Sequence, residues 1–364
     1  MPLPPRVAPV SSLSAEEERR TARHLALAGL GAVGQRRFAA AHVAVVGAGG
    51  LGSPVVQALA AGGVGRLTVI DDDDVELTNL QRQGLHRLTD IGRPKVDSAV
   101  RVAADIAPEC RVDAVRERLD ADNAARLLAG ADIVVDGTDT MATRQVVGDW
   151  CAASGVPLVW GVVQETAGQV TVFWSDPPAG HAPTRLTDLF PGEPAGGVPT
   201  CAEVGVLTPV VHQVGAIMAT QVLLLVAGIG EPLLGRVAVV DALRSTTREV
   251  PLAPATRSDR PLPERTGEAD PLAGAGLVID VREPEEHRTG VIPGALLLPL
   301  GQLLADPAAV ARAADGREVA VVCQAGPRAE RAAAALSRVG VRARSVAGGM
   351  AGWTGAIERP GGRA

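Results

Sequence analysis

The sequence contains few aromatic residues, few cysteines and no excess of positive charge. Its 364 residues include three Phe, four Trp and no Tyr, so few rings are available to stack on nucleic-acid bases. Lys and Arg total 35 against 41 Asp and Glu, and the resulting net charge of −6 would repel nucleic acid and acidic membranes. The four cysteines form no CxxC pair, which predicts separate thiols in a reducing, cytoplasmic compartment.

Long uninterrupted apolar runs are also absent. The first ten residues carry four prolines and no apolar core of a signal peptide. The most apolar stretch, residues 204–230, is interrupted by Pro209, His212, Gln213 and Gln221. We therefore expect neither secretion nor a membrane span. With 46% apolar residues, the chain is long enough for two or three domains of ~100–200 residues with real cores.

The apolar pattern of the first two thirds predicts a Rossmann-like α/β domain. A capping box at Ser14 to Glu17 opens a helix that we expect to run to about Leu30. Alternating strands and helices follow, and they predict a mostly parallel sheet with helices on both faces. We expect strands at residues 42–46, 67–70, 132–135, 158–163 and 168–174, and helices at 52–61, 95–106 and 120–128.

Two proline-rich segments divide the chain. Residues 176–200 contain six prolines, which predicts an irregular loop much longer than the ~4–6 residues of a median connection. Residues 251–271 contain five prolines and have the composition of a semi-rigid linker. We therefore predict domains at 1–250 and 272–364, joined by a linker at 251–271. The second is a smaller α/β domain, with strands at 276–281, 295–298 and 318–322 and a helix at 329–339.

A glycine-rich turn follows the first predicted strand. Gly47, Gly49 and Gly52 have GxGxxG spacing, which lets backbone amides and the following helix dipole face a phosphate without Cβ obstruction. Asp71 lies 19 residues after Gly52, at the end of the second strand, where an acid would bind a ribose hydroxyl. A nicotinamide- or flavin-dependent dehydrogenase would fit these features equally well.

The residues from Asp71 to Gln83 indicate whether the ligand is a dinucleotide or a nucleoside triphosphate. They combine a run of acids with an amide and a guanidinium, and Lys95 follows Arg82 by 13 residues. A triphosphate carries about four negative charges and needs several cations plus a metal, whereas a dinucleotide has one pyrophosphate. This segment therefore favours a nucleoside triphosphate.

In combination, six segments resemble the ubiquitin-activating superfamily and, within it, the bacterial MoeB and ThiF adenylyltransferases of molybdopterin and thiamine synthesis. The resemblance covers roughly residues 14–250. The matching segments are Arg20-x-x-Arg23-His24, Val46 to Pro54, Gly63-Val64-Gly65, Asn79 to Gln83, Gly92-x-Pro94-Lys95 and Gly137-Thr138-Asp139.

This resemblance implies a role for each matching residue. ATP would be held by the glycine loop and the acids after the second strand, namely Gly47, Gly49, Gly50, Gly52, Asp71 and Asp73. Asn79, Arg82 and Lys95 would bind the phosphates, and Asp139 would bind Mg²⁺. Arg23 would reach into the neighbouring subunit's site, which implies a homodimer. The partner would be a small ubiquitin-like sulfur carrier protein that ends in Gly-Gly.

The cysteines of the first domain have different expected roles. Cys201 ends the long loop, where its thiol would be accessible, and the resemblance implies a covalent link to the carrier during sulfur transfer. The alternative is that Cys201 is buried and only packs, as a small apolar residue would. Cys110 and Cys151 lie in predicted helices and are interpreted as packing residues. Many relatives bind zinc through two CxxC pairs, but residues 185–188 have no cysteine, so we expect no zinc site.

In the second domain, Cys323 follows a strand and precedes Arg328, which begins a helix. Loop amides, a helix N-terminus and a cation are conditions that stabilise a thiolate or persulfide. Together with the segments 280–286, 290–295 and 348–353, this loop resembles a rhodanese domain, a thiosulfate or persulfide sulfurtransferase, over residues ~270–358. In this sequence Val291 stands where rhodaneses usually have histidine, and Gln324 stands where arginine or lysine is common. Because Cys323 and Arg328 are present, we predict an active domain with an altered preference for the sulfur donor.

Together the two domains predict one reaction sequence. MgATP would adenylate the C-terminal glycine carboxylate of the carrier, mainly through positioning and electrostatics. A persulfide on Cys323, formed from a persulfide or thiosulfate donor, would then convert the carrier to a thiocarboxylate with help from Cys201. Two alternatives stay open: a dinucleotide-dependent oxidoreductase fused to a sulfurtransferase, and a non-catalytic carrier-binding scaffold.

Overall fold

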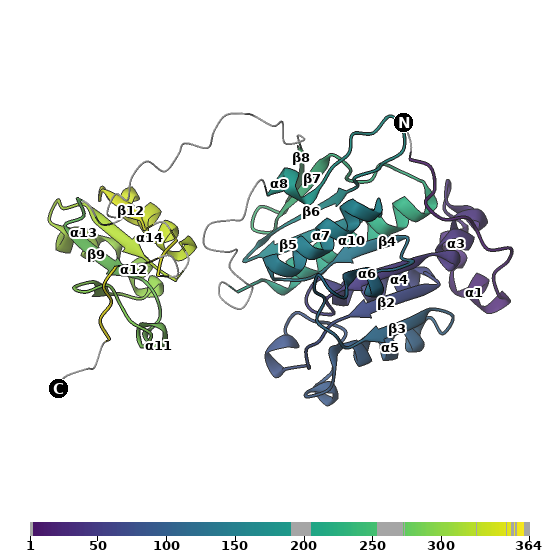
Figure 1. The fold of residues 1–364 in the computed structure, drawn as a ribbon, viewed down its shortest axis with the longest axis horizontal. Helices are drawn as coiled ribbons and strands as arrows, with labels where there is room; N and C mark the ends of the chain where they lie inside the picture. The colour runs from purple at the N-terminus through teal and green to yellow at the C-terminus, as the bar shows by residue number, and fades with distance from the viewer. Residues whose placement is uncertain are drawn as a thin grey trace. The chain divides into compact units, whose positions relative to one another are not determined.

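The computed structural model describes residues 3–190, 205–252, 272, 274–324, 326–346, 348–350, 353 and 355–359. These residues form two compact units, one ending at residue 252 and one beginning at residue 272 (Figure 1). Each unit is described by itself below. The expected linker at 251–271 lies almost entirely outside the described residues, apart from Pro251 and Leu252.

The first unit is built on an eight-stranded sheet in the order β3-β2-β1-β4-β5-β6-β7-β8. The strands from β3 to β5 are parallel, whereas β6, β7 and β8 run antiparallel to their neighbours. The predicted mostly parallel α/β fold is confirmed. The strand bounds are β1 His42–Val46, β2 Arg66–Ile70, β3 Arg111–Val115, β4 Ile133–Asp136, β5 Leu158–Gln164, β6 Ala167–Phe173, β7 Arg236–Asp241 and β8 Thr246–Pro251.

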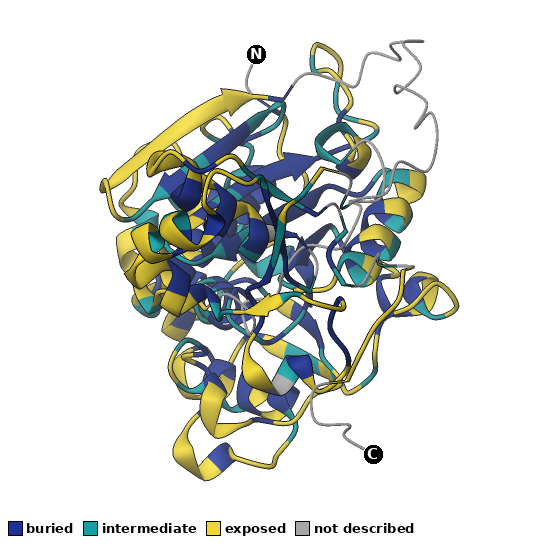
Figure 2. Cartoon of the chain, turned by 90° about the vertical axis from the view of Figure 1, so that its left-hand side faces the viewer, coloured by how far each residue is buried: buried dark blue, intermediate teal, exposed yellow. Residues whose placement is uncertain are grey.

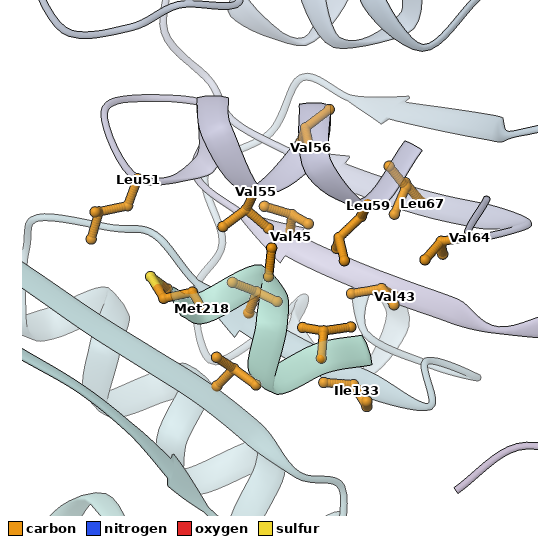
Figure 3. Close-up of a cluster of buried hydrophobic side chains, with 14 of the residues drawn as sticks. Val43, Val45, Leu51, Val55, Val56, Leu59, Val64, Leu67, Ile133 and Met218 are labelled. Atoms are coloured by element: carbon orange, nitrogen blue, oxygen red, sulfur yellow. The ribbon is translucent and has the colours of Figure 1, made fainter. Parts of the chain in front are cut away.

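Helices cover both faces of this sheet because side chains alternate along each strand. Val43 and Val45 of β1 pack into one core cluster, and Ala44 and Val46 into another on the opposite face. Figure 3 shows Val43 and Val45 facing α4. The first cluster includes α3 Gly31–Ala40, α4 Gly52–Gly62, α5 Lys95–Ile106 and α10 Thr208–Ala227; the second includes α6 Ala124–Leu127, α7 Met141–Ser154 and α8 Leu186–Leu189.

Helix α10 is long and apolar enough to cross a membrane by length and composition. However, 61% of its apolar window is buried inside the structure. It packs against α3, α4, β5 and β6, and its buried Gln221 accepts a hydrogen bond from the backbone of Leu233 at 2.7 Å. These contacts make α10 a core helix of the first unit.

The first predicted helix is shorter than expected. Ser14 does cap it, accepting the Glu17 amide at 3.0 Å, but α1 ends at Arg20 (Ala15–Arg20) and α2 is only Ala22–Leu25. The Thr21 hydroxyl bonds the Glu17 carbonyl at 2.7 Å, which competes with regular helical bonding. Gly29 and Gly31 then adopt positive φ, so the continuous helix predicted to Leu30 was wrong.

Three other expectations need correction. The helix predicted over 120–128 is restricted to α6, because the Asp120 carboxylate binds the amides of Asp122 and Asn123 in a turn. Residues 176–200, predicted as irregular throughout, contain the single helical turn α8. Cys110 lies in a turn after α5 instead of on a helix.

The second unit contains a parallel four-stranded sheet in the order β10-β9-β11-β12. Apolar residues of β9 and β11 pack against α12, α13 and α14, and buried residues in both units lie mainly in their interiors (Figure 2). The bounds are β9 Leu277–Asp280, α11 Pro284–His287, β10 Leu296–Leu297, α12 Leu300–Ala305, α13 Pro307–Ala314, β11 Val319–Val322, α14 Pro327–Arg338 and β12 Ala343–Ser345.

Candidate active sites

The glycine turn between β1 and α4 is packed too tightly for larger residues. Gly47 has a φ of +93°, and a Cβ there would lie 3.0 Å from the Gly137 carbonyl. A Cβ on Gly52 would overlap the carbonyl oxygen of Gly47. At Gly49 the nearest atom to such a Cβ is 3.6 Å away, in the side chain of Gln83. The turn can therefore bring backbone amides close to a ligand at the carboxyl edge of the sheet.

Asp71 lies beside this turn, directly after β2. One of its carboxylate oxygens accepts the Ala48 amide at 2.7 Å, and the other accepts the Asp73 amide at 2.9 Å. Burial raises the pKa of Asp71, and the nearby Lys95 charge and both amide bonds act in the opposite direction. The structure thus brings Asp71 to the glycine loop, and its predicted ribose contact stays a prediction.

The remaining acids of the run are each paired with a cation. Lys95, at the start of α5, has only 9% of its side chain exposed, whereas the arginines extend from the segment after β3. The carboxylates of Asp71, Asp72 and Asp73 also offer oxygens within 4.8 Å of one another. The pairs are Asp72 with Arg118 at 3.0 Å, Asp73 with Lys95 at 2.7 Å, and Asp74 with Arg116 at 2.8 Å.

Asn79 and Arg82 belong to the segment that follows these acids. Asn79 ends the 3-10 helix Leu77–Asn79, is buried, and accepts the Glu76 amide at 3.1 Å. Arg82 donates to the Thr78 carbonyl at 3.0 Å, and its Cγ lies 4.0 Å from the position of a Cβ on Gly50. Arg82 therefore flanks the glycine loop, and Asn79 shapes the segment that carries Arg82.

Asp139 is exposed on the loop after β4, above a buried polar cluster. Asp136 is wholly buried and accepts both the amide and the hydroxyl of Thr138, at 2.9 and 2.6 Å. Arg144 donates to the Thr138 carbonyl at 2.6 Å and lies 5.7 Å from the centre of the Trp160 ring. Burial raises the pKa of Asp136, against the opposing charge of Arg144. These contacts fix the turn that leads to Asp139.

Arg23 and the cysteines of the first domain lie apart from this loop or outside the described residues. Arg23 is exposed on α2, and among the described residues no hydrogen bond or ion pair joins it to the glycine loop. Cys201 lies outside the described residues. Cys110 and Cys151 are buried, and burial raises the pKa of Cys110 to about 12 and that of Cys151 further. Their packing role agrees with this burial.

The second site surrounds Cys323 at the end of β11. Cys323 is almost fully buried, and its Sγ accepts the Gly326 amide at 3.0 Å. Gly326 has a φ of +118°, which turns the chain into α14. A Cβ on Gly349 would overlap the Cys323 carbonyl, so the glycine there lets a second turn close over the loop.

Two arginines next to this loop are neutralised by carboxylates. Arg328 binds Glu286 through two hydrogen bonds of 2.6 and 2.7 Å, and this pairing lowers the pKa of Glu286. Arg282 is buried, pairs with Asp280 at 2.7 Å, and donates to the Gln324 side chain at 3.3 Å. Val291, which replaces the usual histidine, is buried.

Sequence reasoning missed Arg144 and His86, and it gave Gln83 no role of its own although a matching segment ends there. Arg144, His86 and Gln83 are each at least nine-tenths buried around the glycine turn or the loop of Asp139. A basic residue five positions after Asp139, inside a helix, was the available signal for Arg144. Arg116 and Arg118 were missed because the strand before them, β3, carries charged residues. Its sequence therefore does not stand out as a strand.

Comparison with known proteins assigns the family. The ThiF family model matches residues 21–261, and a rhodanese-like domain model matches residues 265–356. The chain is 38% identical to the probable adenylyltransferase/sulfurtransferase MoeZ of Mycobacterium tuberculosis, over 96% of each chain. It is 42% identical to the sulfur carrier protein adenylyltransferase of Thermus thermophilus, over 65% of this chain and 87% of that protein.

Solved structures show the same fold. The crystal structure of Escherichia coli MccB in complex with N-formylated MccA has a TM-score of 0.57 at 20% identity, and the match covers 66% of this chain and 75% of MccB. The family matches also argue against the oxidoreductase alternative. The chain therefore belongs to the ThiF family, as a member that carries a C-terminal rhodanese-like domain.

Proposed function

We propose that this enzyme uses ATP to adenylate the C-terminal glycine carboxylate of a small ubiquitin-like sulfur carrier, and then converts that carboxylate to a thiocarboxylate. The observation that carries the proposal is the convergence of the glycine turn, Asp71 and the Asp139 loop at the carboxyl ends of β1, β2 and β4. Relatives named as adenylyltransferases, including one acting on a sulfur carrier protein, support it.

The nucleotide would be held by groups of opposite charge on either side of the glycine loop. Asp71, which accepts two backbone amides beside the turn, would bind the ribose, and amides of the turn would bind the phosphates. Arg82 flanks Gly50, and Lys95 is held near Asp71 by its pair with Asp73. In the step itself a carboxylate oxygen of the carrier attacks the α-phosphorus and pyrophosphate leaves, so the cations stabilise the charge on the leaving group.

The Asp139 carboxylate fits a Mg²⁺ ion. It is an exposed oxygen donor on a turn fixed by Asp136 and Arg144, and the same turn contacts Gly47 of the phosphate loop. When bound, Mg²⁺ would neutralise phosphate charge and favour departure of pyrophosphate. Asp139 would hold the ion, and the buried cluster beneath it would keep the carboxylate in place.

Sulfur transfer would start at Cys323. The Cys323 thiolate, whose Sγ accepts the Gly326 amide, would attack the outer sulfur of a persulfide or thiosulfate donor, form a persulfide and release the donor's thiolate or sulfite. The terminal sulfur would attack the carrier acyl carbon and expel AMP, which leaves an acyl disulfide. A thiolate, for which Cys201 is the candidate, would attack the Cys323 sulfur and release the thiocarboxylate. The resulting disulfide would then be reduced by an external thiol.

Assembly and location complete the proposal. Arg23 is exposed on α2 of its own chain, so a homodimer would let it serve the neighbouring site. Separate buried thiols agree with a reducing cytoplasm.

The test is to incubate the chain with candidate carriers, MgATP and a sulfur donor, and to weigh the carrier. Success gives a carrier heavier by the difference between sulfur and oxygen, together with released pyrophosphate. Omitting the donor should still give pyrophosphate and AMP-carrier. A chain that takes up sulfur on Cys323 but releases no pyrophosphate with any carrier ending in Gly-Gly would refute the adenylation step.

A further inference from the structure

His86 lies under the glycine turn although no motif marks it. It is 8% exposed, and its Nε2 lies 3.1 Å from the Oε1 of Gln83. Its ring also lies near the backbone of Ala48, whose amide donates to Asp71. Ala48 is the first residue after Gly47 in the turn, so both Asp71 and His86 lie beside the glycine loop.

The contact with Gln83 has a defined direction. In the orientation that the structure gives Gln83, its Oε1 faces Nε2, so a hydrogen bond there requires the Nε2–H tautomer of His86, and the buried Nδ1 has no hydrogen-bond partner among the described residues. With its oxygen engaged, Gln83 turns its amide nitrogen away from His86. That nitrogen lies 3.6 Å from the position of a Cβ on Gly49. The two N–H donors of Gln83 therefore lie beside the turn.

The surroundings keep the imidazole uncharged near neutral pH. Burial and the positive charge of Lys95 lower the pKa of His86 to about 4. Asp90 and Arg101 also face the ring and act in opposite directions. A neutral ring adds no charge to the cations that the phosphates must meet, and it leaves a single fixed donor.

We propose that His86 is a positioning residue of the nucleotide site, which orients the Gln83 carboxamide through its Nε2–H so that the amide donors of Gln83 face the phosphates above Gly49. The inference rests on the adenylation proposed above, because it assigns His86 a part in that site. Gln83 would then contact the nucleotide, and His86 would act only through Gln83 and the turn.

Three variants separate this role from simple packing. His86→Gln keeps an amide donor where Nε2 lies, His86→Leu keeps the volume without a donor, and Gln83→Leu removes the oriented group. His181→Gln, on the segment before α8, is the matched control. The readouts are the KM for ATP and kcat in carrier-dependent ATP–pyrophosphate exchange, the KM for the carrier, and direct binding of an ATP analogue.

Loss of one such hydrogen bond weakens binding about tenfold. His86→Leu should therefore raise the KM for ATP about tenfold and leave the KM for the carrier unchanged, whereas His86→Gln should stay within about threefold of wild type. In the Gln83→Leu background, His86→Leu should have no further effect. Equal ATP affinity in wild type and His86→Leu, or full additivity with Gln83→Leu, overturns the proposal.

A spectroscopic measurement on the wild-type protein tests the tautomer directly, and it needs only the conservative variant to assign the signal. Nitrogen NMR of histidine-labelled wild-type protein, with His86→Gln assigning the signal, should show the neutral Nε2–H tautomer of His86 at neutral pH. The Nδ1–H tautomer or an imidazolium contradicts the proposed contact. A wild-type chain without ATP–pyrophosphate exchange contradicts the proposed function instead, so the two failures are distinguishable.

Discussion

The proposed nucleotide site of the first unit gathers residues from Gly47 to Asp139, whereas the proposed sulfur site of the second unit is largely one loop that begins at Cys323 and leads to Arg328. In the first site, paired acids and cations surround a turn of bare backbone. In the second, two neutralised arginines hold a loop around a single sulfur atom. The first arrangement suits a large polyanion, and the second suits one reactive atom.

The largest expected effects come from removing the sulfur-carrying cysteine of one site and the proposed Mg²⁺ ligand of the other. Cys323→Ala should abolish sulfur transfer to the carrier, because no other described thiol lies in a comparable loop, and leave pyrophosphate release within about twofold. Asp139→Ala should lower adenylation by about 10²–10³-fold and leave persulfide formation on Cys323 unchanged. Pyrophosphate release and persulfide labelling measure the two activities. Equal loss of both in either variant would show that the sites do not work separately.

The contrast between the two sites also explains what sequence could predict. The glycine turn, Asp71 and the Cys323 loop each follow a short β-branched strand, so local pattern alone located them. Strand β3 was missed because Arg111 and Asp113 interrupt its apolar pattern at the sheet edge. His86 and Arg144 were missed although their partners Gln83 and Thr138 lie only a turn or two away in the sequence, because buried polar contacts leave no periodic signal.

A second prediction concerns the buried cluster under Asp139. Arg144→Leu should lower the free energy of unfolding of the first unit by about 3–5 kcal/mol, because it leaves Asp136 buried without a cation. Chemical denaturation measures this. Arg126→Leu, on the exposed side of α6, is the control and should leave the stability almost unchanged, because water and salt screen its pair with Glu117. A similar small effect at Arg144 would mean that Thr138 alone fixes the turn.

A third prediction separates the two units by pH. The folded-state pKa of His86 is about 4, below its usual 6.5, so the unfolded chain binds this proton before the folded chain does as pH falls. The stability that neutral His86 contributes is therefore lost as pH falls from about 6.5 to about 4. The pKa of Glu286 is also lowered, so its contribution is present above about 4.5 and is lost below that value.

The measurement is the stability of each variant relative to wild type across pH. The advantage of wild type over His86→Gln should shrink between about pH 6.5 and pH 5, whereas its advantage over Glu286→Gln should stay constant there and shrink only below about pH 4.5. If both variants showed the same dependence on pH, the predicted electrostatic difference between the two units would be wrong.

The smallest expected effect concerns the ion pairs of Asp72, Asp73 and Asp74. A variant of Arg118 tests whether these pairs act as one network or separately. Arg118 is 75% exposed and its partner Asp72 is 38% exposed, whereas Lys95 in the neighbouring pair is only 9% exposed. Exposed pairs are screened by water and salt, so Arg118→Ala should change the free energy of unfolding by less than about 0.5 kcal/mol and the KM for ATP by less than about twofold. Denaturation and pyrophosphate exchange at two salt concentrations measure both. If Arg118→Ala changed the KM for ATP as much as a Lys95 variant does, the pairs would act as one network. In that case Asp72, once released from Arg118, would compete with Asp73 for Lys95.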